Sequence, residues 1–486
     1  MMSEKPDILL INPFSWIRDG SPAYLPYGVL YLAGYLRGKG IKVDIFDANT
    51  DPTDPLEVVA RNRPLALGLS VLTGPVINEA LKISRAAKSR FKDIKIIWGG
   101  LHPTLFPKYV LGEDSVDFII QAEGENALFR LMDALLKSRE DPSVRNLGYK
   151  DKGNIFINPV EDSLIDLNLS PMPAWDLVDM PKYIANRFFA SRVLTMNTSR
   201  GCPFKCAFCF NQGLPYQRWR SLNAGNIFKQ LMRLKDNYGI NGIQFYEDSF
   251  DTDKNRVKEF CNLMISSEAK VNWSHFSNII YCDEAMLRLE KAANCKYVEY
   301  GVESGSDRIL QLINKRQDVA QIKEAFQVCK RVGIKSAALF MIGYPSETKE
   351  ELKETIDLVE GLPAHILIST IYRPYPGTPL YDYCAKNKNF FVPATLEAQG
   401  EFYRFSHMKD GACNMSFVST EYLLKLQRSF YAKFAIKEAI LCLKEFNFGL
   451  IIYYLKRQMK PKALCYTIKS LFNRLSLRSR DRVVNE

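Results

Sequence analysis

Short apolar runs alternate with longer segments of helical period through the first 136 residues of the chain. The short runs predict buried strands, and segments in which apolar residues recur every three or four positions predict amphipathic helices. Strands are expected at 8–12, 42–46, 65–70, 94–98 and 118–120, and helices at 29–36, 76–91 and 126–136. This alternation predicts an α/β fold, a Rossmann-like parallel sheet with right-handed crossovers.

A second series of strand–helix units begins near residue 191. Its strands are expected at 193–198, 242–245, 271–275, 297–300, 336–341 and 366–371. Six such units predict a partial (β/α)6 barrel, in which the active site gathers at the carboxyl ends of the strands.

The two series suggest how the chain divides into domains. We expect an N-terminal domain at 1–145, a linker at 146–190, the barrel at 191–390 and a mostly helical region at 391–486. Prolines punctuate the stretch 170–176, which suits a linker.

Composition narrows the class of protein. Of 486 residues, 47% are apolar, which allows large cores, and eleven are cysteines, too few for a disulfide scaffold. Neither a secretory signal after Met1 nor an uncharged apolar run of ~18 residues is found. A cytoplasmic protein that is not integral to a membrane is expected.

Three cysteines in one short run carry the strongest chemical signal. Cys202, Cys206 and Cys209 form a C-x-x-x-C-x-x-C motif. Because iron–sulfur cubanes are normally held by four cysteines, three thiolates leave one iron open for a small molecule. A zinc site would usually close with a nearby fourth Cys or His, and none of the four histidines lies near this run.

The remaining cysteines fall on apolar faces of the expected elements, where a cysteine usually packs as a small hydrophobe. They are Cys261, Cys282, Cys295, Cys329, Cys384, Cys413, Cys442 and Cys465.

Small and polar residues cluster at the strand ends of the N-terminal series. Ligands bind at this edge of open parallel sheets, and glycine lets a bulky ligand approach the backbone. The first strand is not followed by the G-x-G-x-x-G that a dinucleotide fold would require. The candidate binding residues are Ser70, Thr73, Gly74, Gly99, Gly100, His102, Glu123 and Gly124.

Together these motifs resemble a known enzyme family over residues 7–385. The cysteine run resembles the signature of the radical S-adenosylmethionine (radical SAM) enzymes. The N-terminal series resembles the cobalamin-binding domain found in front of many of them, as in the class B methyltransferases. The alternative for the N-terminal series is a flavodoxin-like fold that binds nothing.

The resemblance implies roles for residues at the barrel strand ends. The three cysteines would hold a 4Fe–4S cluster, with Phe208 shielding it and contacting adenine. Glu247 and Asp248 would bind the amino group of S-adenosylmethionine, although a helix N-cap explains such acids as well. The remaining implied contacts with ribose, carboxylate, adenine and cofactor are Glu303, Ser304, Gly343 and Arg373.

One departure from the relatives bears on cobalamin. Residues 14–20 lack the histidine of the Asp-x-His-x-x-Gly motif that coordinates cobalt from below. Cobalamin is therefore expected without a protein histidine ligand. For His102, a role in shaping its turn and a contact with the cofactor both stay open. The chain also departs from common family patterns at 275–278 and 293–295.

The resemblance implies radical chemistry on a small molecule. The reduced cluster would cleave S-adenosylmethionine, and the resulting radical would take a hydrogen atom from an unactivated carbon. Methylcobalamin would then supply a methyl group. The alternative is a cyclase of the tetrapyrrole type that transfers no methyl, and a cofactor-binding protein without turnover is disfavoured by the intact motifs. A flavodoxin- or ferredoxin-type reductant is expected as partner.

The C-terminal region is aromatic and basic. Residues 448–455 are apolar and aromatic, and much of the net charge of +11 lies in the residues that follow. A helix of this kind can lie on the inner face of an anionic membrane as a peripheral contact. Such a location would suit a lipidic substrate. A solvated end of a capping helix explains the same pattern equally, and nucleic-acid binding is the weaker interpretation.

Overall fold

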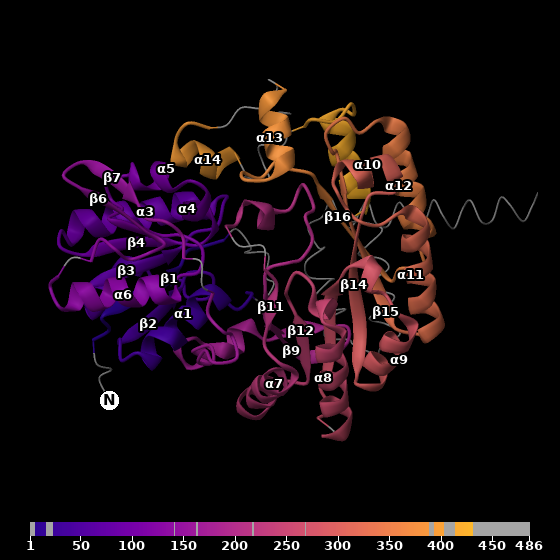
Figure 1. Cartoon of the computed structure of the whole chain (residues 1–486), viewed down its shortest axis with the longest axis horizontal. Helices are drawn as coiled ribbons and strands as arrows, with labels where there is room; N and C mark the ends of the chain where they lie inside the picture. Colours follow the sequence, from indigo (N-terminus) through magenta and orange to yellow (C-terminus); the bar gives the residue numbers. More distant parts are fainter. Residues whose placement is uncertain are drawn as a thin grey trace, which may run out of the picture.

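Two sheets that lie side by side dominate the computed structural model, which describes residues 5–15, 23–139, 141–161, 164–215, 218–267, 269–387, 393–402 and 414–430 (Figure 1). The N-terminal sheet occupies the indigo and purple half of Figure 1, and the barrel sheet occupies the magenta and orange half.

The N-terminal sheet confirms the predicted Rossmann-like architecture. Its strand order over the described residues is β2-β1-β3-β4-β5-β6-β7, and β1 to β5 are parallel. The central strand is buried along residues 8–11, as its continuous apolar run requires. The strands are β1 (Ile8–Asn12), β2 (Val43–Asp47), β3 (Ala66–Ser70), β4 (Lys95–Gly99), β5 (Phe118–Ile120), β6 (Leu147–Asp151) and β7 (Asn154–Ile157). The helices are α1 (Tyr27–Gly38), α2 (Pro55–Asn62), α3 (Val76–Arg90), α4 (Leu101–Leu105), α5 (Pro107–Leu111) and α6 (Glu125–Leu136).

The segment 146–190, expected as a linker, contains three complete strands: β6 and β7 of the N-terminal sheet and β8 (Ala185–Arg187) of the second sheet. β6 pairs antiparallel with β5 and β7 pairs antiparallel with β6, so both extend the N-terminal sheet. The hairpin turns at Lys152 and Gly153, both with positive φ, a two-residue turn that matches the twist of the strands. After the hairpin the chain passes through the short 3-10 helices η1 (Trp175–Leu177) and η2 (Met180–Tyr183).

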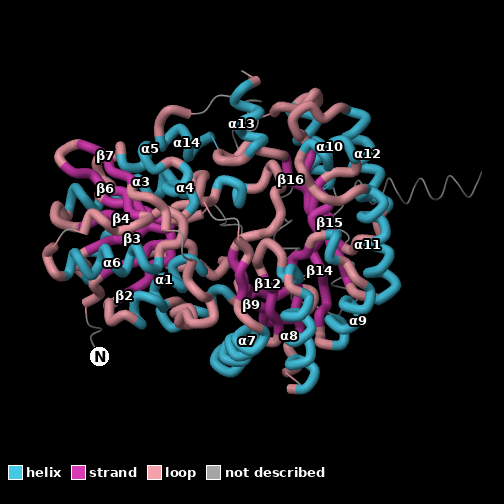
Figure 2. The backbone as a smooth tube through the Cα atoms, viewed as in Figure 1, coloured by secondary structure: helices cyan, strands magenta, loops and turns pink. Residues whose placement is uncertain are grey.

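The second sheet confirms the predicted partial barrel. Its order over the described residues is β16-β15-β14-β13-β12-β9-β8, and all strands except β8 are parallel. Helices cover its outer side (Figure 2). The strands are β8 (Ala185–Arg187), β9 (Ala190–Met196), β12 (Gly242–Phe245), β13 (Asn272–Ser277), β14 (Cys295–Glu303), β15 (Lys335–Ile342) and β16 (Ile366–Ile371), with β10 (Ser199–Arg200) and β11 (Arg220–Ser221) forming a small separate pair. The helices are α7 (Ala224–Tyr238), α8 (Lys254–Ser266), α9 (Glu284–Ala292), α10 (Asp307–Leu312), α11 (Val319–Val332), α12 (Lys349–Gly361), α13 (Pro379–Lys386) and α14 (Leu396–Phe402), with 3-10 turns η3 (Phe210–Gly213), η4 (Phe250–Thr252) and η5 (Ile279–Tyr281).

Helix α14 packs against α3 of the N-terminal half, although it follows the barrel in sequence (Figure 1). Asn78 donates a hydrogen bond of 2.9 Å to Glu401, and Arg85 pairs with Glu397 at 2.6 Å. The C-terminal chain therefore reaches back to the first sheet.

The C-terminal region is described only in part. Residues 420–430 are helical, within the region 391–486 that was expected to be mostly helical, whereas the apolar segment 448–455 and the basic residues after it lie outside the described residues. Among the helices that the structure describes, none is long and apolar enough to cross a membrane.

Candidate active site

The cysteine motif lies on a loop that follows β9 and is fixed by hydrogen bonds to distant elements. The Ala207 N–H donates to the Ile313 carbonyl at 2.8 Å. Gly201 has φ +79°, and a Cβ there would come within 2.5 Å of the Arg218 carbonyl oxygen, so this turn requires glycine. The loop is therefore held in one conformation before any ligand binds.

The three cysteine thiols share a partly buried space. Cys206 is buried, and Cys202 and Cys209 are half-buried. Burial is the main cause that raises the pKa of Cys202 to about 11 and that of Cys209 to about 12, and the charges of Asp248 and of neighbouring cysteines contribute to both shifts. Clustered thiols of this kind ionise together only when a cation compensates their charge, as metal ligation does. The thiol cluster fits an iron–sulfur centre.

A buried ammonium group lies beside the cysteines. The Lys315 Nζ is 3.0 Å from a Glu303 carboxylate oxygen. Burial alone would lower the pKa of Lys315, but the charges of Glu303 and Cys206 raise it. Lys315 thus places a positive charge next to the thiolates. Sequence analysis missed it because a lysine at a helix–loop junction carries no distinctive pattern.

The two acidic residues after β12, Glu247 and Asp248, have different surroundings. The Glu247 carboxylate accepts hydrogen bonds from the Thr198 hydroxyl at 2.9 Å and the Ser199 N–H at 2.7 Å, and it pairs with Arg256 at 3.3 Å. Its side chain is 1% exposed. Glu247 therefore holds the base of the cysteine loop, and its contact with the amino group of S-adenosylmethionine stays a prediction.

Asp248 faces the cysteines. Its carboxylate accepts a hydrogen bond of 2.8 Å from Asn211, and its charge raises the pKa values of Cys202 and Cys209. Burial raises the pKa of Asp248 itself. Of the predicted pair, Asp248 is the carboxylate available to a ligand at the cysteine loop.

The end of β14 carries an unusual backbone conformation. Glu303 has φ +64°, a strained region for a side chain other than glycine that tends to occur at functional sites. Its carboxylate is directed to Lys315. Ser304 is fully buried, with its hydroxyl 3.1 Å from that of Thr355 on α12. Ser304 therefore packs against α12, and its contact with the cofactor stays a prediction.

The ends of β15 and β16 bring three more predicted residues to the barrel mouth. The Phe208 ring lies 6.2 Å from that of Tyr344. Gly343 has φ +82°, and its N–H donates to Glu347 at 2.5 Å. Arg373 follows β16 and is 9% exposed.

A cavity of about 260 Å³ opens at the carboxyl edge of the N-terminal sheet. Its lining is mostly glycine and aliphatic side chains, and a Cβ at Gly68 would come within 2.7 Å of Leu10. Five predicted binding residues line it: Ser70, Gly99, Gly100, Glu123 and Gly124. Sequence analysis missed Tyr27, Tyr31 and Arg200, which also line it.

The other three predicted residues of this half lie outside the cavity lining. His102 is fully buried, with Nδ1 3.3 Å from the Thr73 hydroxyl and its ring 5.2 Å from that of Phe106. Burial lowers the pKa of His102 to about 3, so the imidazole is neutral. Gly74 adjoins Thr73 with φ +136°. His102 shapes this loop.

The two halves meet where their strand ends face each other. The Tyr27 and Tyr31 hydroxyls of α1 donate to the carbonyls of Thr195 and Asn197 at 2.7 and 2.9 Å. Both acceptors belong to the segment that leads into the cysteine loop. The cavity and the cysteines therefore share one stretch of chain.

Ion pairs reinforce this contact. Arg200 pairs with Glu125 at 2.6 Å and with Glu123 at 3.4 Å, and Arg220 also pairs with Glu123. Burial would raise the pKa of Glu125, but Arg200 more than offsets this and lowers it. Glu123, predicted to bind a cofactor, is thus tied to the barrel.

An aromatic ladder stands at the carboxyl end of the barrel strands. The ring of Tyr24 stacks on that of Tyr246 at 4.9 Å, and Tyr246 meets Phe276 edge-on at 5.4 Å. Tyr24 and Tyr246 are 41% and 43% exposed. Their faces offer an apolar surface contributed by both halves of the molecule.

Comparison with known proteins assigns a family to each half. The radical SAM superfamily profile matches residues 196–359, and the B12 binding domain profile matches residues 22–131. The chain is 30% identical over 421 residues to an uncharacterized methyltransferase of Pyrococcus horikoshii, covering 86% of this chain and 89% of the relative. It is 28% identical to the anaerobic magnesium-protoporphyrin IX monomethyl ester cyclase of Rubrivivax gelatinosus, covering 73% of this chain and 65% of the cyclase.

Solved structures agree on the fold. The radical enzyme OxsB, solved with aqua-cobalamin and S-adenosylmethionine, matches with a TM-score of 0.69 at 20% identity, covering 97% of this chain and 75% of OxsB. The methyltransferase TsrM of Kitasatospora setae matches with a TM-score of 0.66 at 17% identity, covering 78% of this chain and 74% of TsrM. With both profiles matched in order and 86% of this chain aligned with 89% of the Pyrococcus protein, the chain belongs to the cobalamin-binding radical SAM enzymes, whose cofactors are a 4Fe–4S cluster, S-adenosylmethionine and cobalamin.

Proposed function

We propose that this protein is a cobalamin-dependent radical SAM methyltransferase that methylates an unactivated carbon of an apolar small molecule. The observation that carries the proposal is the shared segment between the two candidate sites: Asn197 and Arg200 line the N-terminal cavity, and Cys202 follows directly on the same loop. Two ligands bound at these places would lie close enough to act on one substrate.

In this proposal Cys202, Cys206 and Cys209 hold the cluster. When bound, the cofactors supply a carbon-centred radical from S-adenosylmethionine and a transferable methyl group from cobalamin. Lys315 supplies positive charge beside the thiolates, and Asp248 is the carboxylate placed to receive the ammonium group of S-adenosylmethionine.

The N-terminal cavity would hold part of cobalamin. Its glycines and aliphatic side chains leave space for a bulky, mostly apolar group. His102 is the only histidine among residues 1–145, and its buried ring does not line the cavity. These positions support cobalamin binding without a histidine ligand to cobalt.

The aromatic ladder of Tyr24, Tyr246 and Phe276 supports an apolar or planar substrate. Stacked rings that stay 41% and 43% exposed present contact area without charge. Because the rings come from both halves, a substrate lying on them would be positioned between the two cofactor sites, as oriented group transfer requires.

The test uses the reconstituted full-length enzyme, S-adenosylmethionine with a deuterated methyl group, and extracts fractionated as candidate substrates. A methyltransferase puts the label into product and forms S-adenosylhomocysteine together with 5′-deoxyadenosine. The similarity to the Rubrivivax cyclase makes cyclisation the second candidate. Product formed with 5′-deoxyadenosine but without label would reject methylation in favour of that reaction.

A further inference from the structure

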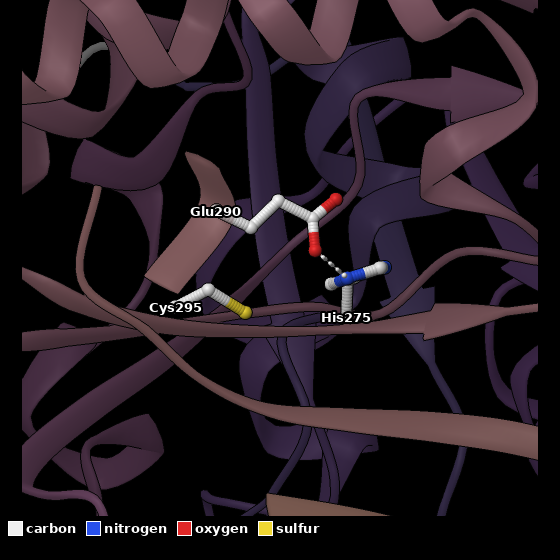
Figure 3. Close-up of side chains that lie close together, drawn as sticks. All are labelled: His275, Glu290 and Cys295. Atoms are coloured by element: carbon white, nitrogen blue, oxygen red, sulfur yellow. Dashed lines mark hydrogen bonds and ion pairs between the residues drawn. The ribbon is translucent and has the colours of Figure 1, made fainter. Parts of the chain in front are cut away.

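A compact group of three potential metal ligands lies away from the cysteine loop. His275 of β13, Glu290 of α9 and Cys295 at the start of β14 point toward one another (Figure 3). Their ligand atoms all lie within 4.8 Å of one another. Because Glu290 comes from a covering helix, the group sits between the sheet and its helices and takes no part in the proposed methyl transfer.

The three side chains are almost completely buried, so any charge on them needs compensation. His275, Glu290 and Cys295 are each exposed by 1%. The rings of Phe250 and Trp273 pack around the imidazole at 5.3 and 5.5 Å. A buried carboxylate costs several kcal/mol unless a positive charge compensates it. A positive charge on or between these side chains would compensate the carboxylate.

Two candidates for that charge are a proton on His275, whose pKa the neighbouring Glu290 raises, and a metal ion. The His275 Nε2 is 3.4 Å from a Glu290 carboxylate oxygen. A charge-assisted hydrogen bond would bring these atoms to about 2.7–2.9 Å. Two ligands of a tetrahedral zinc ion, each about 2.0–2.1 Å from the metal, lie about 3.3 Å apart. The observed separation fits two ligands of one zinc ion, and because an ion pair such as that of Arg256 and Glu247 at 3.3 Å reaches the same length, the zinc content decides between them.

The orientation of the imidazole agrees with metal ligation. His275 Nδ1 is 3.3 Å from the Phe276 carbonyl oxygen, and Nε2 faces Glu290. Metal-binding histidines typically give one ring N–H to such an acceptor and offer the other nitrogen to the metal. The turn that carries Cys295 is also fixed, because the Trp273 indole N–H donates to the Ala293 carbonyl at 2.7 Å.

We propose that His275, Glu290 and Cys295 form a structural site for a divalent transition metal, zinc in the first place, that joins β13, α9 and β14. A neutral imidazole, a carboxylate and a thiolate cancel the charge of the ion, so the complete site is neutral, as its burial requires. Mixed nitrogen, oxygen and sulfur ligands are those that zinc accepts. A cavity of about 10 Å³ beside His275 and Glu290 has room for about one water, and the buried carboxylate of Asp251 also lines it, so a water or Asp251 can complete the ligand set.

The first experiment needs no variant. Zinc K-edge absorption of the holoenzyme, prepared with zinc in the medium, reads zinc without interference from cluster iron. The proposal expects roughly one zinc per chain, with one sulfur at about 2.3 Å and the remaining ligands nitrogen or oxygen at about 2.0–2.1 Å. Protein without bound zinc would overturn it, and so would a zinc shell of three sulfurs, which would place the ion in the cysteine loop instead.

A matched pair of variants then tests the assignment. Cys295→Ala should weaken zinc binding by more than about 100-fold, because loss of a metal ligand should cost more than loss of a residue that only hydrogen-bonds to a ligand. Cys384→Ala, at another fully buried cysteine, should keep zinc. If Cys295→Ala does not fold, Glu290→Gln replaces it and should also lose zinc. Equal zinc in Cys384→Ala and in whichever ligand variant folds would overturn the proposal.

Discussion

The N-terminal sheet and the barrel sheet both carry candidate sites at the carboxyl ends of parallel strands, but the sites are made of different groups. The N-terminal cavity is lined by glycines and aliphatic side chains, and its charges lie at the rim in Arg200 and Glu123. The barrel site gathers thiols, Asp248 and the Lys315–Glu303 pair. One sheet edge offers space for a bulky ligand, and the other offers charge and metal ligands. The same architecture thus supports two kinds of binding, set by the loop residues.

The largest effect is expected from a substitution that disrupts the site of the barrel and leaves the N-terminal cavity intact. Cys206→Ala should remove the brown cluster chromophore and lower S-adenosylmethionine cleavage by more than about 100-fold, since a metal ligand contributes more than a supporting group does. Cobalamin binding, measured by retained absorbance after gel filtration, should persist. Cys384→Ala is the matched control and should keep both. Full cleavage activity in Cys206→Ala would contradict the assignment of the cluster ligands.

The next effect concerns the contact between the two sheets. Arg200→Gln leaves buried Glu125 without its partner and should lower the free energy of unfolding by about 2–4 kcal/mol, measured with denaturant. Arg37→Gln breaks an exposed pair with Asp176 and should cost under about 1 kcal/mol.

This contact also has a predicted pH dependence. Arg200 lowers the pKa of Glu125, so its contribution to stability is present above the pKa of an unfolded glutamate and is lost as the pH falls through the lower folded value. Equal losses for Arg200→Gln and Arg37→Gln would show that the buried pair does not join the halves.

A third substitution should weaken binding in the N-terminal cavity and leave the cluster site intact. Gly68→Leu places a side chain against Leu10 in the cavity, where overpacking costs about 1–3 kcal/mol and should weaken cobalamin binding roughly 10- to 100-fold. The control Gly361→Leu adds the same side chain where no atom lies within 4 Å of the new Cβ. Cluster absorbance should be unchanged in both. Normal cobalamin affinity in Gly68→Leu would place the ligand elsewhere.

The smallest effect compares two buried carboxylates. Burial raises the pKa of Glu347 to about 7, opposite to the shift of Glu125. The folded state then binds the extra proton, so stability is highest below the unfolded value and falls as the pH rises through 7. Glu347→Gln should therefore be more stable than the parent at pH 8 by about 1–2 kcal/mol, but not at acid pH. Exposed Glu350→Gln should show no such difference, and a uniform effect of Glu347→Gln at all pH values would exclude titration as its cause.

The sequence was sufficient for the sheets and for the position of the cysteine loop, because both follow from local patterns. Apolar runs locate β1 and β12 to the residue, and loops after parallel strands must meet at one edge. The direction in which an individual side chain points could not be predicted from the sequence. Glu247 and Asp248 are adjacent in sequence, but they have different partners. Glu247 accepts a hydrogen bond from the backbone of the cysteine loop, whereas Asp248 faces the thiols.

Residues that act across the domain contact were also beyond the sequence. Tyr31 meets the barrel 166 positions later in the chain, and nothing local marks it as an interface residue. The group of His275, Glu290 and Cys295 is similar, since Cys295 alone was interpreted as a packing residue. Only the fold brings its two partners within reach.

The return of α14 to α3 has a consequence for motion. A domain joined to another through one linker can rotate about that linker, but here the N-terminal half is attached both before and after the barrel in the order of the chain. Two attachments on separate elements restrict such rotation more than a single linker does. Under the proposed function, a substrate would then have to reach both sites in this arrangement, so its length and flexibility would contribute to specificity.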